Sequence, residues 1–149
     1  MLIHDNQYLE TLRNLLNEAD EVSMAVAFWG EGSESIFKDY KGDPPRIICN
    51  LKLGGTNPKA IRKLKEKWEN AKIRQHDDLH AKLVLTESQM IVGSANISSN
   101  GLGLEDGKEA GLRELGIRSR NARQLGAARK WFDQLWNNEA REIDDLAAC

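Results

Sequence analysis

The chain has 149 residues, of which 40% are hydrophobic and 30% charged, and its formal net charge is −2 at pH 7. This length and composition fit one globular domain with a core of its own. The slightly negative charge excludes a strongly basic protein, and no apolar segment approaches the length of a membrane-spanning helix.

The first half of the chain alternates between helical and strand patterns. Apolar residues recur at helical spacing over 6–19, which predicts an amphipathic helix. The apolar run over 21–30, closed by glycines, predicts a buried strand. A weak helix or loop over 31–45 ends at a Pro-Pro pair, and 46–51 predicts a second buried strand.

A helix is predicted next, because Asn57 can cap it and Pro58 suits its first position. Its buried stripe is formed by Ile61, Leu64 and Trp68. We expect short strands over 72–77, 80–86, 89–95 and 112–119. Four glycines make the 100–111 segment an expected exposed loop.

The last predicted helix begins near Asn121, which has capping-box spacing to Gln124. Its expected inner face consists of Leu125, Ala128, Phe132, Leu135, Trp136 and Ile143. This order of elements predicts an α/β fold, a mixed β-sheet flanked by helices on both faces, in a single domain over 1–149.

The N-terminal stretch lacks the basic start and apolar run of a signal peptide, so we expect a cytoplasmic protein. Cys49 lies in an apolar run and Cys149 is the last residue. They form no metal-binding spacing, and we expect Cys49 to be a core residue without a disulfide.

Positive charge is concentrated in the 59–74 segment, with a second cluster at Arg113, Arg118, Arg120, Arg123 and Arg129. A basic run on a helix is usually a solvated face. A phosphate backbone as partner is the other interpretation, and charge alone leaves both open.

His80 and Lys82 are two residues apart in a predicted strand, so their side chains point to the same side of the sheet. An imidazole and an ammonium on one face can form a phosphate site. After the next strand, Gly93 leaves room for a ligand, while Ser94 and Asn96 can donate a hydroxyl and an amide.

The other histidines have no such neighbours in the sequence. His4 is expected at the surface near the N-terminus. His76 and His80 could suggest a metal pair only if their segment were helical, and no third ligand is evident. We therefore expect no metal and no cofactor.

This pair of motifs resembles the signature of the phospholipase D superfamily: His-x-Lys, four residues, Asp, then Gly-Ser-x-Asn about six residues later. The matching residues are His80, Lys82, Glu87, Gly93, Ser94 and Asn96. Glu87 departs from the usual Asp, an acid whose role in the family is mainly structural. A further acid usually follows on the next strand and holds the histidine. Glu114 is the best candidate for that acid, with Glu109 as runner-up.

The resemblance implies a catalytic set of His80, Lys82, Ser94, Asn96 and Glu114. Family members use two motif copies at one active site, and this chain has one. The expected form is therefore a homodimer that shares one cleft, with a phosphohistidine intermediate.

A compact chain with one motif and no lipid-binding segment resembles the small nucleases of this superfamily. The resemblance therefore favours a metal-independent endonuclease acting on DNA or RNA. Two alternatives remain open at this point. One is a non-catalytic nucleic-acid-binding or assembly module with the same fold. The other is a hydrolase or transferase of phospholipid head groups. No membrane partner is expected, since no amphipathic membrane stripe is present.

Overall fold

The computed structural model describes residues 1–68, 72–98, 102, 104 and 112–143. These residues form one mixed sheet of eight strands in the order β1-β7-β6-β5-β2-β3-β4-β8. The strands are β1 (Leu2–His4), β2 (Val22–Val26), β3 (Arg46–Cys49), β4 (Lys72–Gln75), β5 (Lys82–Thr86), β6 (Met90–Gly93), β7 (Leu115–Ser119) and β8 (Arg141–Glu142). Strands β2, β3 and β4 are parallel to one another, and the other neighbours pair antiparallel.

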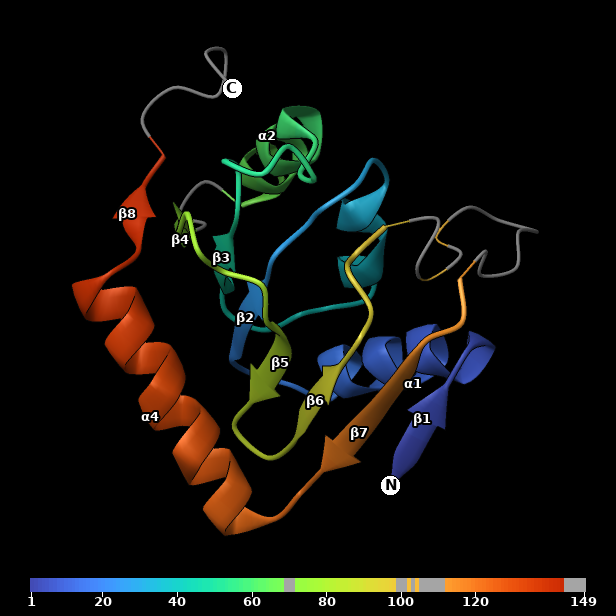
Figure 1. Cartoon of the computed structure of the whole chain (residues 1–149). Coiled ribbons are helices and arrows are strands. Elements are labelled where there is room, and N and C mark those ends of the chain that lie inside the picture. The colour runs from blue at the N-terminus through green and yellow to red at the C-terminus, as the bar shows by residue number, and fades with distance from the viewer. Residues whose placement is uncertain (69–71, 99–101, 103, 105–111, 144–149) are drawn as a thin grey trace.

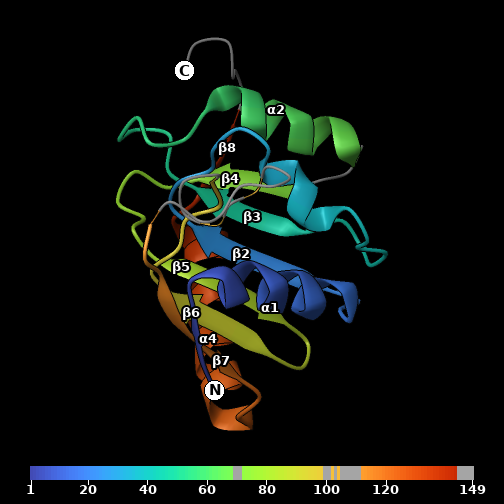
Figure 2. The ribbon, with the colours of Figure 1, turned by 90° about the vertical axis from the view of Figure 1, so that its right-hand side faces the viewer.

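Helices cover both faces of this sheet (Figures 1 and 2). One face carries α1 (Asn6–Asn17), the 3₁₀ helix η1 (Ser33–Phe37) and α2 (Pro58–Lys67), which share a core with β2, β3 and β4. The other face carries α4 (Ala122–Asn138), which packs on β2, β3 and β5. The expected fold class is therefore confirmed, and Cys49 is a fully buried core residue with a free thiol.

Local capping signals place the helix starts correctly. The Asn57 side chain accepts a hydrogen bond from the backbone N–H of Lys59 at 2.9 Å, ahead of Pro58. Asn121 accepts one from the backbone N–H of Gln124 at 3.0 Å. Both contacts satisfy backbone donors that a helix start leaves open.

Two strands were missed by the sequence patterns, and one helix is shorter than predicted. β1 has three residues and β8 has two, so neither carries a readable alternation. The last helix ends at Asn138, and Ile143 lies beyond it as a partly buried residue next to the α1-side core. The expected loop over 100–111 lies almost entirely outside the described residues.

Two arginines of the sheet fix α4 through aromatic side chains. The guanidinium of Arg46 lies 4.9 Å from the centre of the Phe132 ring, and that of Arg74 lies 4.3 Å from the Trp136 ring. The two rings are stacked on each other. Arg74 belongs to the basic 59–74 run, so at least one charge of that run stabilises the fold through cation–π contacts.

On the face that carries α4, the edge of the sheet formed by β6, β7 and β1 is not covered by a helix of the described residues. One row of side chains crosses four neighbouring strands, through the pairs Leu83–Val92, Val92–Ile117 and Ile117–Leu2. Exposure rises along this row from 4% at Leu83 to 45% at Val92, 52% at Ile117 and 64% at Leu2. The opposite face of the same strands is buried, with Ile91 and Ile3 fully covered. We call Val92, Ile117 and Leu2 the open apolar face.

The described part of the chain contains no helix that combines the length and the apolarity needed to cross a bilayer.

Candidate active site

His80 and Lys82 lie at the end of the sheet where β5 begins. Lys82 is the first residue of β5, and the carbonyl of Ala81 accepts a hydrogen bond from Ala27 N–H at 3.0 Å, so the extended pairing with β2 reaches back toward His80. The Lys82 ammonium donates to the His80 carbonyl at 3.0 Å. His80 itself precedes the strand rather than lying inside it, a small correction to the expected range of 80–86.

The His80 imidazole is held from one side by an aromatic residue that follows β2. The ring of Phe28 meets it edge-on, with centroids 6.3 Å apart. Phe28 in turn packs against Gly55, where a Cβ atom would overlap the Phe28 ring. Asn50 holds the segment just before His80, since its side-chain amide donates to the carbonyl of Leu79 at 2.9 Å. The backbone before His80 is therefore fixed by contacts from two strand ends.

Ser94, an exposed residue just after β6, pairs with the buried Glu114. The Ser94 hydroxyl donates to the Glu114 carboxylate, and the backbone N–H of Leu115 donates to the Ser94 hydroxyl at 3.0 Å. Glu114 is 8% exposed, and Asp5 holds its backbone from both directions. Among the described contacts, this carboxylate bonds to Ser94 and not to His80.

Tyr8 of α1 supports this pair from below the sheet. It packs against Gly93 and Gly116, where an added Cβ atom would collide with the Tyr8 ring or hydroxyl. Burial raises the pKa of Tyr8 to about 12, against a lowering effect of the Ala95 backbone, and the nearby Glu114 charge adds to the rise. Tyr8 therefore stays a neutral hydrogen-bonding phenol throughout the physiological range.

One cavity brings three of the five expected residues together. It has a volume of about 510 Å³, and His80, Lys82 and Ser94 line it along with Val92 and Trp131. Trp131 comes from α4 and is 44% exposed. Because Val92 also belongs to the open apolar face, the cavity and that face are continuous. We call this cavity the His80 pocket.

Asn96 does not line the His80 pocket. Its side-chain oxygen is buried, and no described residue donates a hydrogen bond to it. Leaving a buried amide oxygen without a donor is costly, at about 1–3 kcal/mol. Glu109, the second candidate acid, lies outside the described residues.

Glu87 stands at the far end of β5, away from His80. Its carboxylate accepts hydrogen bonds from the backbone N–H groups of Asp20 at 2.8 Å and Glu21 at 3.1 Å. Partial burial works to raise the pKa of Glu87, but these backbone donors outweigh it and the pKa lies below its usual value. The contacts join the β5–β6 turn to the start of β2, which is the structural role expected for this acid.

The other two histidines have protein partners. His4 pairs with Asp5 at 3.3 Å, and His76 lies 3.5 Å from Glu139 while its Nδ1 accepts from the Asp78 backbone. Within the described ranges, no three His, Cys, Asp or Glu side chains are grouped so that they could hold a metal ion.

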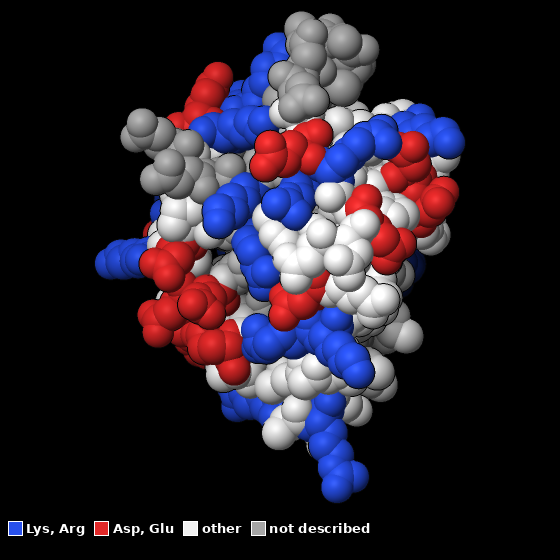
Figure 3. Space-filling model, turned by 90° about the vertical axis from the view of Figure 1, so that its left-hand side faces the viewer, with Lys and Arg blue, Asp and Glu red and all other residues white. Residues whose placement is uncertain are grey.

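Charge is mixed on the face that α4 and β8 occupy, where Lys and Arg alternate with Asp and Glu (Figure 3). Several cations there are already paired, as in Arg46 with Asp133 at 3.1 Å and Arg141 with Asp77 at 3.2 Å. Such pairing favours the interpretation of this surface as a solvated face over a track for a phosphate backbone.

Sequence reasoning missed Phe28, Tyr8, Asp5 and Trp131 as neighbours of the site. Phe28 belongs to the 21–30 run and Tyr8 to the apolar stripe of 6–19, so both read as ordinary core positions. Trp131 is on the exposed side of the α4 pattern and reaches the pocket because the middle of α4 passes beside β5. No local signal marks these positions.

No protein-family model matches the sequence, and no curated protein matches it. Solved structures do match in fold. NucT from Helicobacter pylori is 15% identical, with 96% of this chain aligned to 100% of that one and a TM-score of 0.70. Nuc from Salmonella typhimurium, described as a phospholipase D family member, is 13% identical over 97% of this chain and 99% of that one, with a TM-score of 0.71. Phosphatidylserine synthase from Haemophilus influenzae is 12% identical, with 99% of this chain aligned to 40% of that one and a TM-score of 0.68.

Proposed function

The chain has the phospholipase D fold, and from this premise we propose that it is a metal-independent phosphodiesterase, a nuclease that cleaves DNA or RNA. The observation that carries the proposal is the convergence of His80, Lys82 and Ser94 on one pocket. These side chains lie in or next to two neighbouring strands, and they supply a nucleophile, a positive charge and a hydroxyl that Glu114 holds in place.

The first step is attack on a phosphodiester by the neutral imidazole of His80. A nitrogen–phosphorus bond forms while the bond from phosphorus to the leaving oxygen breaks. The protonated imidazole of the partner's His80 gives its proton to that oxygen, so an alcohol leaves. Lys82 stabilises the negative charge on the phosphoryl oxygens, which is the role that a metal ion plays in other phosphodiesterases.

The second step removes the phosphoryl group from His80. The partner's His80, now neutral, takes a proton from water, and the oxygen of that water attacks the phosphorus. The nitrogen–phosphorus bond breaks and a phosphomonoester is released. Glu114 is a positioning residue that holds the Ser94 hydroxyl. The amide of Asn96, expected at the phosphoryl oxygens, is assigned no contact with them because Asn96 does not line the pocket.

A second copy of the chain is needed, because these steps require two imidazoles and the sequence has one His-x-Lys motif. The open apolar face is the surface we assign to that second copy. It is built from Val92, Ile117 and Leu2, and it runs into the His80 pocket through Val92. A twofold axis beside this pocket would place both His80 side chains at one phosphorus atom.

Nucleic acid is the substrate we favour, because a cleft open at the proposed dimer interface admits a long polymer. The fold shared with phosphatidylserine synthase keeps phospholipid head groups as the second candidate. A binding module without catalysis is the third outcome of the test below.

The test incubates the protein with single- and double-stranded DNA and with RNA in excess EDTA. Cleavage that survives chelation and is lost in His80→Ala supports the proposal. Binding without cleavage, unchanged in His80→Ala, would replace it with a binding module. Release of head groups from phospholipid vesicles with nucleic acid left intact would replace it with the lipid enzyme.

A further inference from the structure

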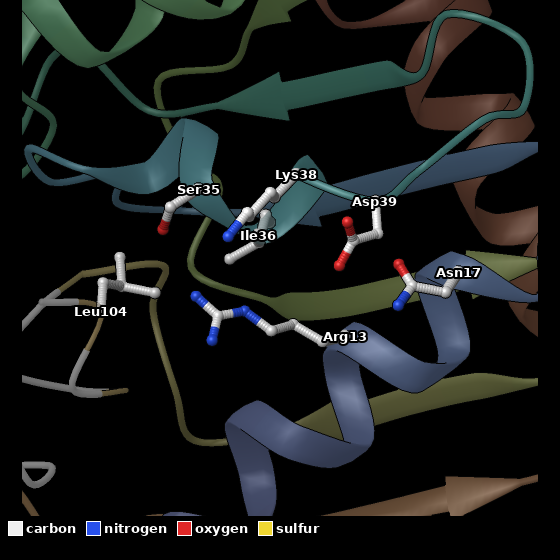
Figure 4. Close-up of a pocket in the computed structure, with 7 residues that line it drawn as sticks. All are labelled: Arg13, Asn17, Ser35, Ile36, Lys38, Asp39 and Leu104. Atoms are coloured by element: carbon white, nitrogen blue, oxygen red, sulfur yellow. The ribbon is translucent and has the colours of Figure 1, made fainter. Parts of the chain in front are cut away.

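A polar cavity lies between α1 and η1, on the face of the sheet opposite α4 (Figure 4). Its volume is about 350 Å³, which is at the lower end of the range for small-molecule sites of ~300–1,000 Å³. It shares no lining residue with the His80 pocket, so the proposed reaction does not use it. We call it the Arg13 pocket.

One end of the Arg13 pocket is positively charged. The guanidinium of Arg13 and the ammonium of Lys38 both point into it, on the side where Ser35 and Leu104 lie (Figure 4). Neither cation is paired with a carboxylate of the described chain. The Ser35 hydroxyl oxygen is buried, and it too has no hydrogen-bond partner there. Two cations and a hydroxyl that have no such partners among the described residues are donors that can bind a phosphate group.

The other end of the pocket has a different character. The carboxylate of Asp39 and the amide of Asn17 face each other there (Figure 4). A carboxylate accepts hydrogen bonds from hydroxyl groups, and an amide both donates and accepts them. The same carboxylate repels a phosphate, so a ligand that carries one should place it at the cationic end of the pocket. Ile36 and Leu104 add apolar surface to the pocket, with Leu104 at the cationic end (Figure 4).

We propose that the Arg13 pocket binds a phosphorylated sugar, the unit found in a nucleotide. Its phosphate lies between Arg13 and Lys38 and accepts a hydrogen bond from Ser35. Its hydroxyls lie against Asp39 and Asn17. Inorganic phosphate alone would satisfy the cationic end and leave the polar groups at the other end unused.

Isothermal titration with ribose 5-phosphate and with inorganic phosphate tests this proposal. Arg13→Gln and Lys38→Gln should each weaken ribose 5-phosphate binding about tenfold or more, since each removes a charge-assisted hydrogen bond. Lys41→Gln, which removes an exposed charge three residues from Lys38, is the matched control and should bind as the unaltered protein does. Melting temperatures of all variants show that each is folded.

Asp39→Ala separates the sugar phosphate from a simple anion. Removing this carboxylate should weaken ribose 5-phosphate binding while inorganic phosphate binds as well as before or more tightly. Lys82→Ala should leave both affinities unchanged, so the result does not depend on the proposed nuclease activity. The proposal is overturned if ribose 5-phosphate shows no saturable binding, if Arg13→Gln and Lys38→Gln bind it normally, or if Lys82→Ala abolishes binding instead.

Discussion

Ile117→Glu should weaken the proposed dimer without unfolding the single chain. Ile117 is 52% exposed in the single chain, at the centre of the open apolar face. Fully burying an isoleucine is worth about 1.5–3 kcal/mol, so covering its exposed half contributes about 1 kcal/mol per chain. A twofold interface uses the residue twice, which gives about 2 kcal/mol per dimer. The dimer dissociation constant should therefore rise by at least about 30-fold.

A desolvated carboxylate adds to that loss, since burying an unpaired charge is unfavourable. The monomer itself should remain folded, because the side chain is half in water already. Asn14→Asp is the matched control, with the same change of charge at an exposed position of α1 on the opposite side of the sheet. Sedimentation velocity across a concentration series measures the dissociation constant, and DNA cleavage is assayed at the same concentrations.

The account predicts that Ile117→Glu loses cleavage where it becomes monomeric and regains it at high protein concentration. Two results would refute the reasoning about this face. One is a variant that remains dimeric at all concentrations with an unchanged dissociation constant. The other is a monomeric variant that keeps full cleavage activity.

Three further predictions concern the packing at Gly93, the contacts of Glu87 and the proposed shared site. Gly93→Ala should lower the free energy of unfolding by about 1–3 kcal/mol, because its Cβ would lie 2.8 Å from the Gly116 Cα and overlap the Tyr8 hydroxyl. Gly126→Ala, in open space on α4, should raise the free energy of unfolding by up to about 1 kcal/mol. Chemical denaturation compares the two variants. Glu87→Gln should lower the free energy of unfolding by about 1 kcal/mol at pH 7. Because the folded pKa of Glu87 is depressed, the difference between the two proteins is present above the unfolded pKa and shrinks as pH falls through the folded pKa. Equal stability of the two proteins at pH 7 would contradict this prediction. In mixtures of exchanged wild-type and His80→Ala subunits, cleavage should fall as the square of the wild-type fraction, and a linear fall would indicate independent subunits.

Local signals predicted much of the fold. Asn57 and Asn121 predict the starts of their helices because a helix cap is a contact between residues close in sequence. The buried strands β2 and β3 are mostly apolar, with Ser23 and Arg46 as their polar residues, and a sequence shows such a run directly. The edge strands β1 and β8 exist through pairing with distant partners, Ile117 for Leu2 and Gln75 for Arg141, and such pairing leaves no pattern in two or three residues.

The candidate site was predictable in its motif and not in its surroundings. His80, Lys82 and Ser94 could be assigned to one site because their spacing resembles a known signature and adjacent strands bring them together. The sequence made Glu114 the candidate acid for His80, whereas its bond to Ser94 depends on how Asp5 and Tyr8 fix the start of β7. Period-two alternation marks Val92 and Ile117 as facing one side of the sheet, yet only the path of α4 decides that this side is uncovered.

The number of phosphohistidines per chain tests the shared site most directly. A single turnover on a substrate labelled at the scissile phosphate, quenched in base, traps the covalent intermediate for counting. The account predicts at most one labelled histidine for every two chains, and none in His80→Ala, because the partner's imidazole serves as the acid. One label on every chain, or label retained without His80, would contradict it.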